Sequence, residues 1–303
     1  MKYNILILGS GGFIGSEVFK VIKNLNRYEI FRYSTSLDKQ IDNFDLEKTR
    51  FDVLVFASGI HSNLEQCKNL FIENKKILRI LIKFIKKTKK CIFISSFKTS
   101  IKLEKKIIEE KNIYDCFKYD SIYGKVKIIS EKISIKLFKE NNINYKIICP
   151  SHVIGPSEVE NNPNNLDVIR RSKKIINFVP NCYISLIDVR DVANYISNII
   201  QNEDYNNKKV ILNTNNILFK EYIKKIRLNK FSLILEVNDK IISFLSKFIE
   251  IFYRFTKIRL NILNKFQINY ILSKKITVIR KDITKKYTLE KTFKDIIQKQ
   301  DCP

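Results

Sequence analysis

Glycine is scarce in this chain. Its 303 residues include 7 glycines, 5 prolines and no tryptophan, whereas average usage would place roughly twenty glycines in a chain of this length. Four of the seven glycines lie within residues 9–15, in the run Gly-Ser-Gly-Gly-Phe-Ile-Gly. Because glycine readily adopts positive φ and lets backbone approach another group closely, this concentration indicates a ligand-binding turn.

Metal-ligating residues and long apolar runs are also few. The six cysteines are scattered without a Cys-x-x-Cys pair, and there are two histidines. This pattern argues against a zinc site or a disulfide framework, so we expect no metal, and it suits a reducing cytoplasm. No run of eighteen apolar residues occurs and the first residues lack a signal-peptide pattern. We therefore expect a cytoplasmic protein without a transmembrane segment.

The net charge of +25 has several interpretations. Lysine, isoleucine and asparagine are abundant throughout while glycine, proline and alanine are scarce, which is typical of AT-rich coding. There is no RNP-like aromatic run, helix-turn-helix turn or arginine-rich arm, so we expect no specific nucleic-acid partner. A basic binder of polyanions or a peripheral contact with anionic membranes stays an alternative.

The first half of the chain alternates between strand and helix patterns. Strands are predicted at 3–8, 28–33, 52–57, 90–95 and 145–149, with helices at 14–26, 66–88 and 119–141 between them. This alternation predicts an α/β fold, a Rossmann-type doubly wound parallel sheet spanning residues 1–150.

The pattern changes after Pro150. A polar loop at 155–165 precedes a helix near 189–201, strands near 208–213 and 231–237, a helix at about 239–256 and a last helix near 288–299. We expect residues 151–303 to form a smaller α/β substrate lobe, interwoven with the first region and not independent of it.

The glycine turn follows a buried strand and precedes a helix, which is the arrangement of a dinucleotide phosphate site. Gly9 permits a tight exit from the strand, Gly12 lets backbone approach a pyrophosphate, and Gly15 lets the helix pack closely. We expect Gly11, Phe13 and Ile14 to line the same site. The alternative is a simple strand-to-helix turn.

Two further motifs carry possible chemistry. Tyr123 and Lys127 are four residues apart, so a helix places them on one face. Ser95 and Ser96 end a predicted strand, and in an open parallel sheet ligands sit beyond the carboxyl ends of strands. A serine there can hold a substrate carbonyl against the tyrosine. Taken singly, each motif also suits an exposed helix face or a loop cap.

In this order and spacing, the three motifs resemble the short-chain dehydrogenase/reductase superfamily, and most of all its extended branch, the NAD-dependent epimerase/dehydratase family that acts on nucleotide sugars. The resemblance implies that Tyr123 is the general acid/base. Lys127 would lower the Tyr123 pKa and bind the nicotinamide ribose, and Ser96 would orient the substrate oxygen. Ser95 would contact the substrate, and a homodimer is usual in this family.

Weaker matches extend the resemblance to further cofactor contacts. They include an Asp-hydrophobic pair near the adenine, a small-residue strand end, a helix asparagine and a proline after a later strand. The matching residues are Asp45, Leu46, Ala57, Ser58, Gly59, Asn74 and Pro150.

The sequence also departs from the family pattern. NAD-specific members carry a carboxylate at the end of the second strand, whereas this chain has Ser34 with Arg32 nearby. We therefore lean to NADP over NAD. Phe97 and Lys98 follow Ser96 where sugar 4,6-dehydratases have an Asp-Glu pair, which disfavours dehydratase chemistry.

Four other residues are candidate substrate contacts. His61 and His152 could line the substrate cleft, although a solvated loop or a structural position would also explain them. Arg170 and Arg171 could clamp a diphosphate or form a solvated helix face. The resulting hypothesis is an NAD(P)-dependent epimerase or ketoreductase of a nucleotide-linked sugar, a precursor of surface polysaccharide. A non-catalytic NAD(P)-binding regulatory or assembly protein is the alternative.

Overall fold

The computed structural model describes most of the chain. The described residues are 2–34, 39–40, 45, 48–59, 67–100, 107–108, 122–156, 163–228, 231–244, 247–248, 274, 276–279 and 283–299.

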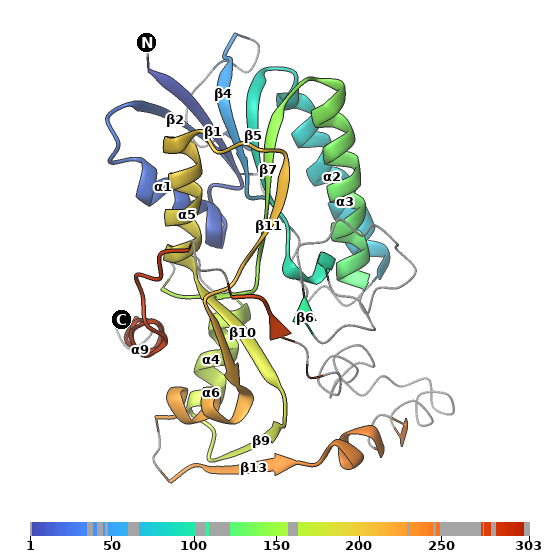
Figure 1. Cartoon of the computed structure of the whole chain (residues 1–303), viewed down its shortest axis with the longest axis vertical. Helices are drawn as coiled ribbons and strands as arrows, with labels where there is room; N and C mark the ends of the chain where they lie inside the picture. The colour runs from blue at the N-terminus through green and yellow to red at the C-terminus, as the bar shows by residue number, and fades with distance from the viewer. Residues whose placement is uncertain are drawn as a thin grey trace.

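One large sheet organises the molecule (Figure 1). Its order is β11-β7-β5-β4-β1-β2-β3, and all its neighbours pair in parallel except the short β3, which is antiparallel to β2. The strands are β1 (Tyr3–Leu8), β2 (Tyr28–Ser34), β3 (Lys39–Gln40), β4 (Phe51–Phe56), β5 (Thr88–Ile94), β7 (Asn144–Pro150) and β11 (Lys208–Leu212). The six-stranded parallel sheet confirms the predicted Rossmann-type α/β class.

Both faces of this sheet are apolar, as expected for parallel strands covered by helices. In β1, Ile5 and Ile7 belong to one core cluster while Leu6 and Leu8 belong to another. Helices α1 (Phe13–Ile22) and α5 (Val189–Asn202) cover the first face, and α2 (Cys67–Ile85) and α3 (Ile122–Glu140) cover the second.

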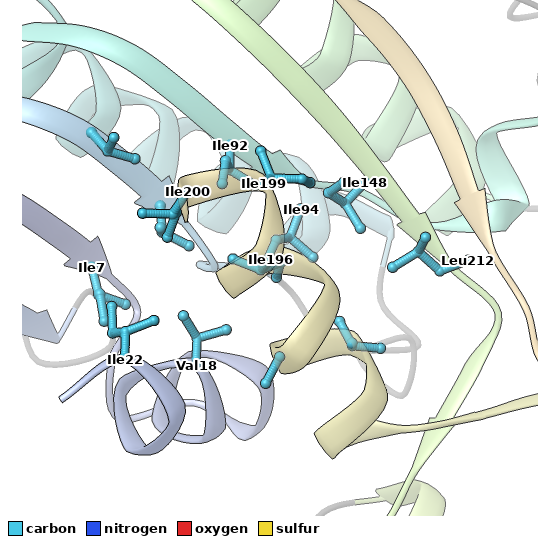
Figure 2. Packing of buried hydrophobic residues seen from close by; sticks show 14 of the residues in the cluster. Ile7, Val18, Ile22, Ile92, Ile94, Ile148, Ile196, Ile199, Ile200 and Leu212 are labelled. Carbon is cyan, nitrogen blue, oxygen red and sulfur yellow. The ribbon is translucent and has the colours of Figure 1, made fainter. Parts of the chain in front are cut away.

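The packing under α1 and α5 shows how the sheet is held from one side. Figure 2 shows Val18 and Ile22 of α1 and Ile196, Ile199 and Ile200 of α5 directed at isoleucines of the strands. All five side chains are buried. Burial of a full aliphatic side chain is worth about 1.5–3 kcal/mol, so this layer is a large share of what stabilises the sheet.

A smaller region lies beyond the carboxyl edge of the sheet (Figure 1). It holds a three-stranded sheet of β12 (Asn215–Leu218), β10 (Tyr183–Asp188) and β8 (His152–Ile154), and two strand pairs: β9 (Ile176–Pro180) with β13 (Leu233–Val237), and β6 (Ile107–Ile108) with β14 (Ile276–Thr277). Helices α4 (Pro163–Ser172), α6 (Phe219–Ile226) and α9 (Leu289–Gln298) pack around a separate apolar core.

The chain after residue 150 belongs to both regions. Helix α5 covers the large sheet, and β11 pairs with β7 as its sixth parallel strand. The chain therefore returns to the sheet layer after residue 150, before it ends in the smaller region.

Several elements of the smaller region were not expected from sequence. Strands β8, β9, β10 and β12 and helices α4 and α6 are short, 3–10 residues each. Such segments carry little periodic signal of their own. Of the predicted helix at 239–256, residues 239–244 and 247–248 are helical, and the rest lies outside the described residues.

No helix in the described part of the chain is both long enough and apolar enough to cross a lipid bilayer.

Candidate active site

The topology creates a ligand crevice at one place on the sheet edge. The chain runs from β1 to its neighbour β2 on one side, and β4 then pairs with β1 on the other side. The direction in which strands are added therefore reverses between β1 and β4. Leu8 and Phe56 are register partners at the ends of these strands, so the turns that follow them lie side by side. Ligands of open α/β sheets bind at such a switch point.

The glycine turn has the geometry that its residues predicted. Gly9 has φ +84°, and its N–H donates to Tyr33 O at 2.8 Å. A Cβ on Gly9 would lie 2.8 Å from Ser58 N, and one on Gly15 would lie 2.2 Å from Gly9 O. Gly15 is therefore required where α1 crosses the turn.

Helix α1 begins directly after this turn and fits a bound phosphate. Its N-cap, Gly12, makes no side-chain capping bond, and the first turn contains no acidic residue. The N-terminal N–H groups and the positive end of the helix dipole suit an anion. A dinucleotide diphosphate would be held here by the backbone of residues 11–15, which include Phe13 and Ile14.

The end of β2 lies beside the glycine turn. A Cβ on Gly11 would lie 3.7 Å from Ser34 Oγ, and the Arg32 guanidinium stacks on the Phe19 ring at 4.3 Å. Asp45 is exposed and pairs with Lys48 at 3.5 Å. Leu46, its predicted partner near the adenine, lies outside the described residues. The Ser34 hydroxyl therefore lies at this edge of the site, while the Arg32 guanidinium lies over Phe19 of α1.

Ser96, Tyr123 and Lys127 come together on the substrate side. Ser96 follows β5 and its hydroxyl is hydrogen-bonded to that of Tyr123. Lys127, one turn further along α3, has its Nζ 5.9 Å from the Tyr123 ring centroid. A Cβ on Gly59 would lie 2.8 Å from that Nζ. The lysine therefore reaches the strand end formed by Ala57, Ser58 and Gly59.

Burial decides the ionisation of these groups. It raises the pKa of Tyr123 to about 12, although the hydrogen bond from Ser96 lowers it in part. This direction is opposite to the one that the resemblance implied for Lys127, because desolvation of the phenolate is the largest cause. Burial also lowers the pKa of Lys127 to about 8, while the Glu131 carboxylate acts in the opposite direction.

Sequence reasoning missed a buried polar network behind these residues. Glu131 Oε2 accepts from Lys209 Nζ at 2.9 Å, and Ser95 Oγ donates to Glu131 Oε1. Lys209 Nζ also donates to Thr99 Oγ1 at 2.6 Å, and the Cys149 thiol lies 3.8 Å from Glu131 Oε1. The helical spacing of four residues places Glu131 on the same face as Lys127, but it gives no signal for the partner Lys209.

The sequence predicts no role for Lys98, which only departs from the Asp-Glu pair of the sugar 4,6-dehydratases. It lies in the 3-10 turn η1 (Phe97–Ser100), and its Nζ is 5.3 Å from the Tyr123 ring centroid. A second amine therefore lies beside Tyr123.

Two predicted site residues, Ser95 and Asn74, form hydrogen bonds with other side chains of the protein. The Ser95 hydroxyl is engaged by Glu131, and Asn74 Oδ1 accepts from Ser130 Oγ at 2.6 Å, which ties α2 to α3. Pro150 is buried at the end of β7.

The predicted substrate contacts lie further out. His152 is half-buried with its ring edge-on to Phe97 at 5.2 Å. Arg170 and Arg171 of α4 both pair with Asp167, at 3.0 and 2.7 Å. His61 lies outside the described residues. Across the residues whose placement is described, no three His, Cys, Asp or Glu side chains gather to hold a metal ion.

Comparisons with known proteins agree with this geometry. The chain resembles Gre2 from Candida albicans in complex with NADPH (18% identity, TM-score 0.67, 98% of this chain and 99% of that one). It also resembles UDP-N-acetylglucosamine 4-epimerase from Methanobrevibacter ruminantium M1 in complex with UDP-N-acetylmuramic acid (17%, 0.66, 99% and 100%). L-threonine dehydrogenase from Phytophthora infestans is a third (12%, 0.69, 98% and 99%).

At these identities the likeness shows the fold. No curated protein sequence gives a significant match. The model of the NAD dependent epimerase/dehydratase family matches residues 5–213, which contain the glycine turn, Ser96, Tyr123 and Lys127. The chain therefore belongs to the NAD dependent epimerase/dehydratase family, in the extended short-chain dehydrogenase/reductase group.

Proposed function

We propose that this protein is an NAD(P)-dependent epimerase or ketoreductase that acts on a nucleotide-linked sugar. The observation that carries the proposal is the convergence of Ser96, Tyr123 and Lys127 beside the switch point. Ser96 and Tyr123 share a hydrogen bond, and Lys127 reaches the strand end at Gly59. A protein that only bound the cofactor would not need all three groups.

The bound nicotinamide would accept or supply a hydride at the reacting carbon. The residues of this chain handle the oxygen on that carbon. Ser96 donates a hydrogen bond to it and sets its position, and Tyr123 takes up or returns its proton. Lys127 holds the ribose, and its positive charge stabilises the Tyr123 phenolate as it forms. This stabilisation lowers the pKa of the phenol during proton transfer.

The residues at the end of β2 favour NADP. Ser34 and Arg32 occupy this edge, and neither repels a 2′-phosphate as a carboxylate would. Arginine is the usual partner of a 2′-phosphate in dinucleotide folds. We therefore expect tighter binding of NADPH than of NADH.

Cofactor binding is the first test of the proposal. Titration calorimetry of the purified protein should show binding of NADPH or NADH, and Gly12→Val should abolish it. A Cβ on Gly12 would lie 3.2 Å from Gly9 O, so the larger valine side chain crowds the turn that would hold the phosphate. Lys23→Val, at the other end of α1, is the matched control and should bind normally. An absence of binding in the wild type would refute the proposal.

Turnover is the second test. Tyr123→Phe should keep the cofactor affinity and lose about 100-fold or more in kcat, because general acid/base catalysis contributes about 10²–10⁴-fold. Interconversion of two sugar epimers would identify an epimerase. Net consumption of reduced cofactor with a keto-sugar would identify a reductase. Retained turnover in Tyr123→Phe would contradict the role given to the phenol.

A further inference from the structure

Lys98 is half-buried and differs from the buried lysines of the described chain. Those that lie away from the site are paired with carboxylates, at 2.7 Å in Lys146–Asp204 and 2.9 Å in Lys209–Glu131. Lys98 has no carboxylate within ion-pair distance among the described residues, and burial alone lowers its pKa. Partial burial without a paired anion disfavours the ammonium form, and an anionic group of a ligand placed beside it would stabilise that form.

The position of Lys98 is fixed by the turn that carries it. Its backbone N–H donates to Ser96 Oγ at 3.4 Å, and Thr99 N–H donates to Ser96 O at 3.0 Å. The Nζ lies 5.3 Å from the centroid of the Tyr123 ring. Lys98 therefore lies next to the hydroxyls proposed to hold the reacting oxygen.

The neighbours of Lys98 do not supply the missing negative charge. His152 is near enough for Lys98 to contribute to lowering its pKa, after burial, to about 3, so the imidazole is neutral. Lys127 is the second amine beside the Tyr123 ring, and its reach to Gly59 places it on the cofactor side. Among the described residues no anion faces Lys98, so its amine is free to take an anionic group of the substrate.

We propose that Lys98 binds a carboxylate on the carbon next to the reacting one, which makes the substrate a nucleotide-linked sugar acid. This inference rests on the proposed function and narrows it. A substrate diphosphate is the alternative anion. However, a diphosphate is common to acidic and neutral nucleotide sugars, so the two sources can be separated by a matched pair of ligands.

The matched pair is UDP-glucuronic acid and UDP-glucose, which differ only in a carboxylate against a hydroxymethyl group. Calorimetry on the cofactor-saturated protein should show UDP-glucuronic acid binding about tenfold or more tightly, as expected for a hydrogen bond between charged groups. Lys98→Met should abolish this difference. Lys125→Met, also half-buried and on the same helix as Tyr123, is the control and should keep it. Equal wild-type affinities, or an equal loss for both sugars in Lys98→Met, would overturn the inference.

A second measurement does not depend on the nucleotide. Amine acylation mapped by mass spectrometry should show Lys98 protected by glucuronic acid 1-phosphate and not by glucose 1-phosphate. Protection without binding of either UDP-sugar would leave the carboxylate site standing and remove the nucleotide from the proposed function. Binding of both UDP-sugars without preference or protection would remove the carboxylate site and leave the proposed function. If none of these ligands binds, both fail.

Discussion

Removal of the cation from the buried Glu131–Lys209 pair is the sharpest test of the buried polar network next to the candidate site. The side chains are 0% and 2% exposed, and Nζ lies 2.9 Å from Oε2. Lys209→Met keeps the apolar stem but leaves the Glu131 carboxylate with the neutral Ser95 and Cys149 donors. Breaking a buried pair from one side costs about 3–5 kcal/mol, and we expect the free energy of unfolding to fall by that amount.

Urea unfolding measures this loss, and two further variants make it specific. Lys89→Met removes an exposed partner of Asp52 and should cost no more than about 1 kcal/mol. The double variant Glu131→Gln with Lys209→Met removes both buried charges, so it should be more stable than Lys209→Met alone. A loss below about 1 kcal/mol in Lys209→Met, or additive effects in the double variant, would refute the reasoning.

Three other predictions follow from single residues. Gly15→Ala should destabilise the protein and weaken cofactor binding although alanine favours helices, because its Cβ would lie 2.2 Å from Gly9 O; wild-type urea stability and affinity would contradict this. His152 has a folded pKa of about 3, below the unfolded value of about 6.5, so the unfolded state binds more protons between these values. Stability should therefore fall as pH drops from 6.5 toward 3, and His152→Gln should flatten that slope in urea unfolding; an unchanged slope would count against it. The pKa of Lys127 near 8 predicts that kcat/KM declines above about pH 8 as the ammonium is lost, and Lys127→Arg should shift that decline upward; a pH profile identical to that of the wild type would contradict the role of this charge.

The local parts of the fold were predictable because their signals are contiguous. The run from Tyr3 to Ile22 contains an apolar strand, four glycines and an apolar helix stripe, and the structure forms β1, the turn and α1 from it. Each step depends on neighbours within a few residues. The helix carrying Tyr123 and Lys127 was found for the same reason.

The smaller region was predicted poorly because its strands are defined by their partners. Strand β9 was missed, although its partner β13 was predicted at 231–237; the two pair across more than fifty residues, and β9 leaves Phe178 exposed. Neither strand has the alternation of apolar and polar residues that would indicate a buried face. Their pairing is set by the sheet and helices around them.

The sequence by itself determined the class of fold and supplied the candidate groups of the proposed site. The glycine turn, the serine pair and the Tyr-x-x-x-Lys spacing each depend on local backbone geometry, so they could be read without coordinates. Only the tertiary structure decided what surrounds those groups. It brought Lys209 to Glu131 across 78 residues, because β11 joins the sheet edge beside β7. It also desolvated the Tyr123 hydroxyl and left Lys98 beside it without an acid among the described residues. Desolvation and long-range charge pairing depend on how distant segments pack, and no local pattern encodes them.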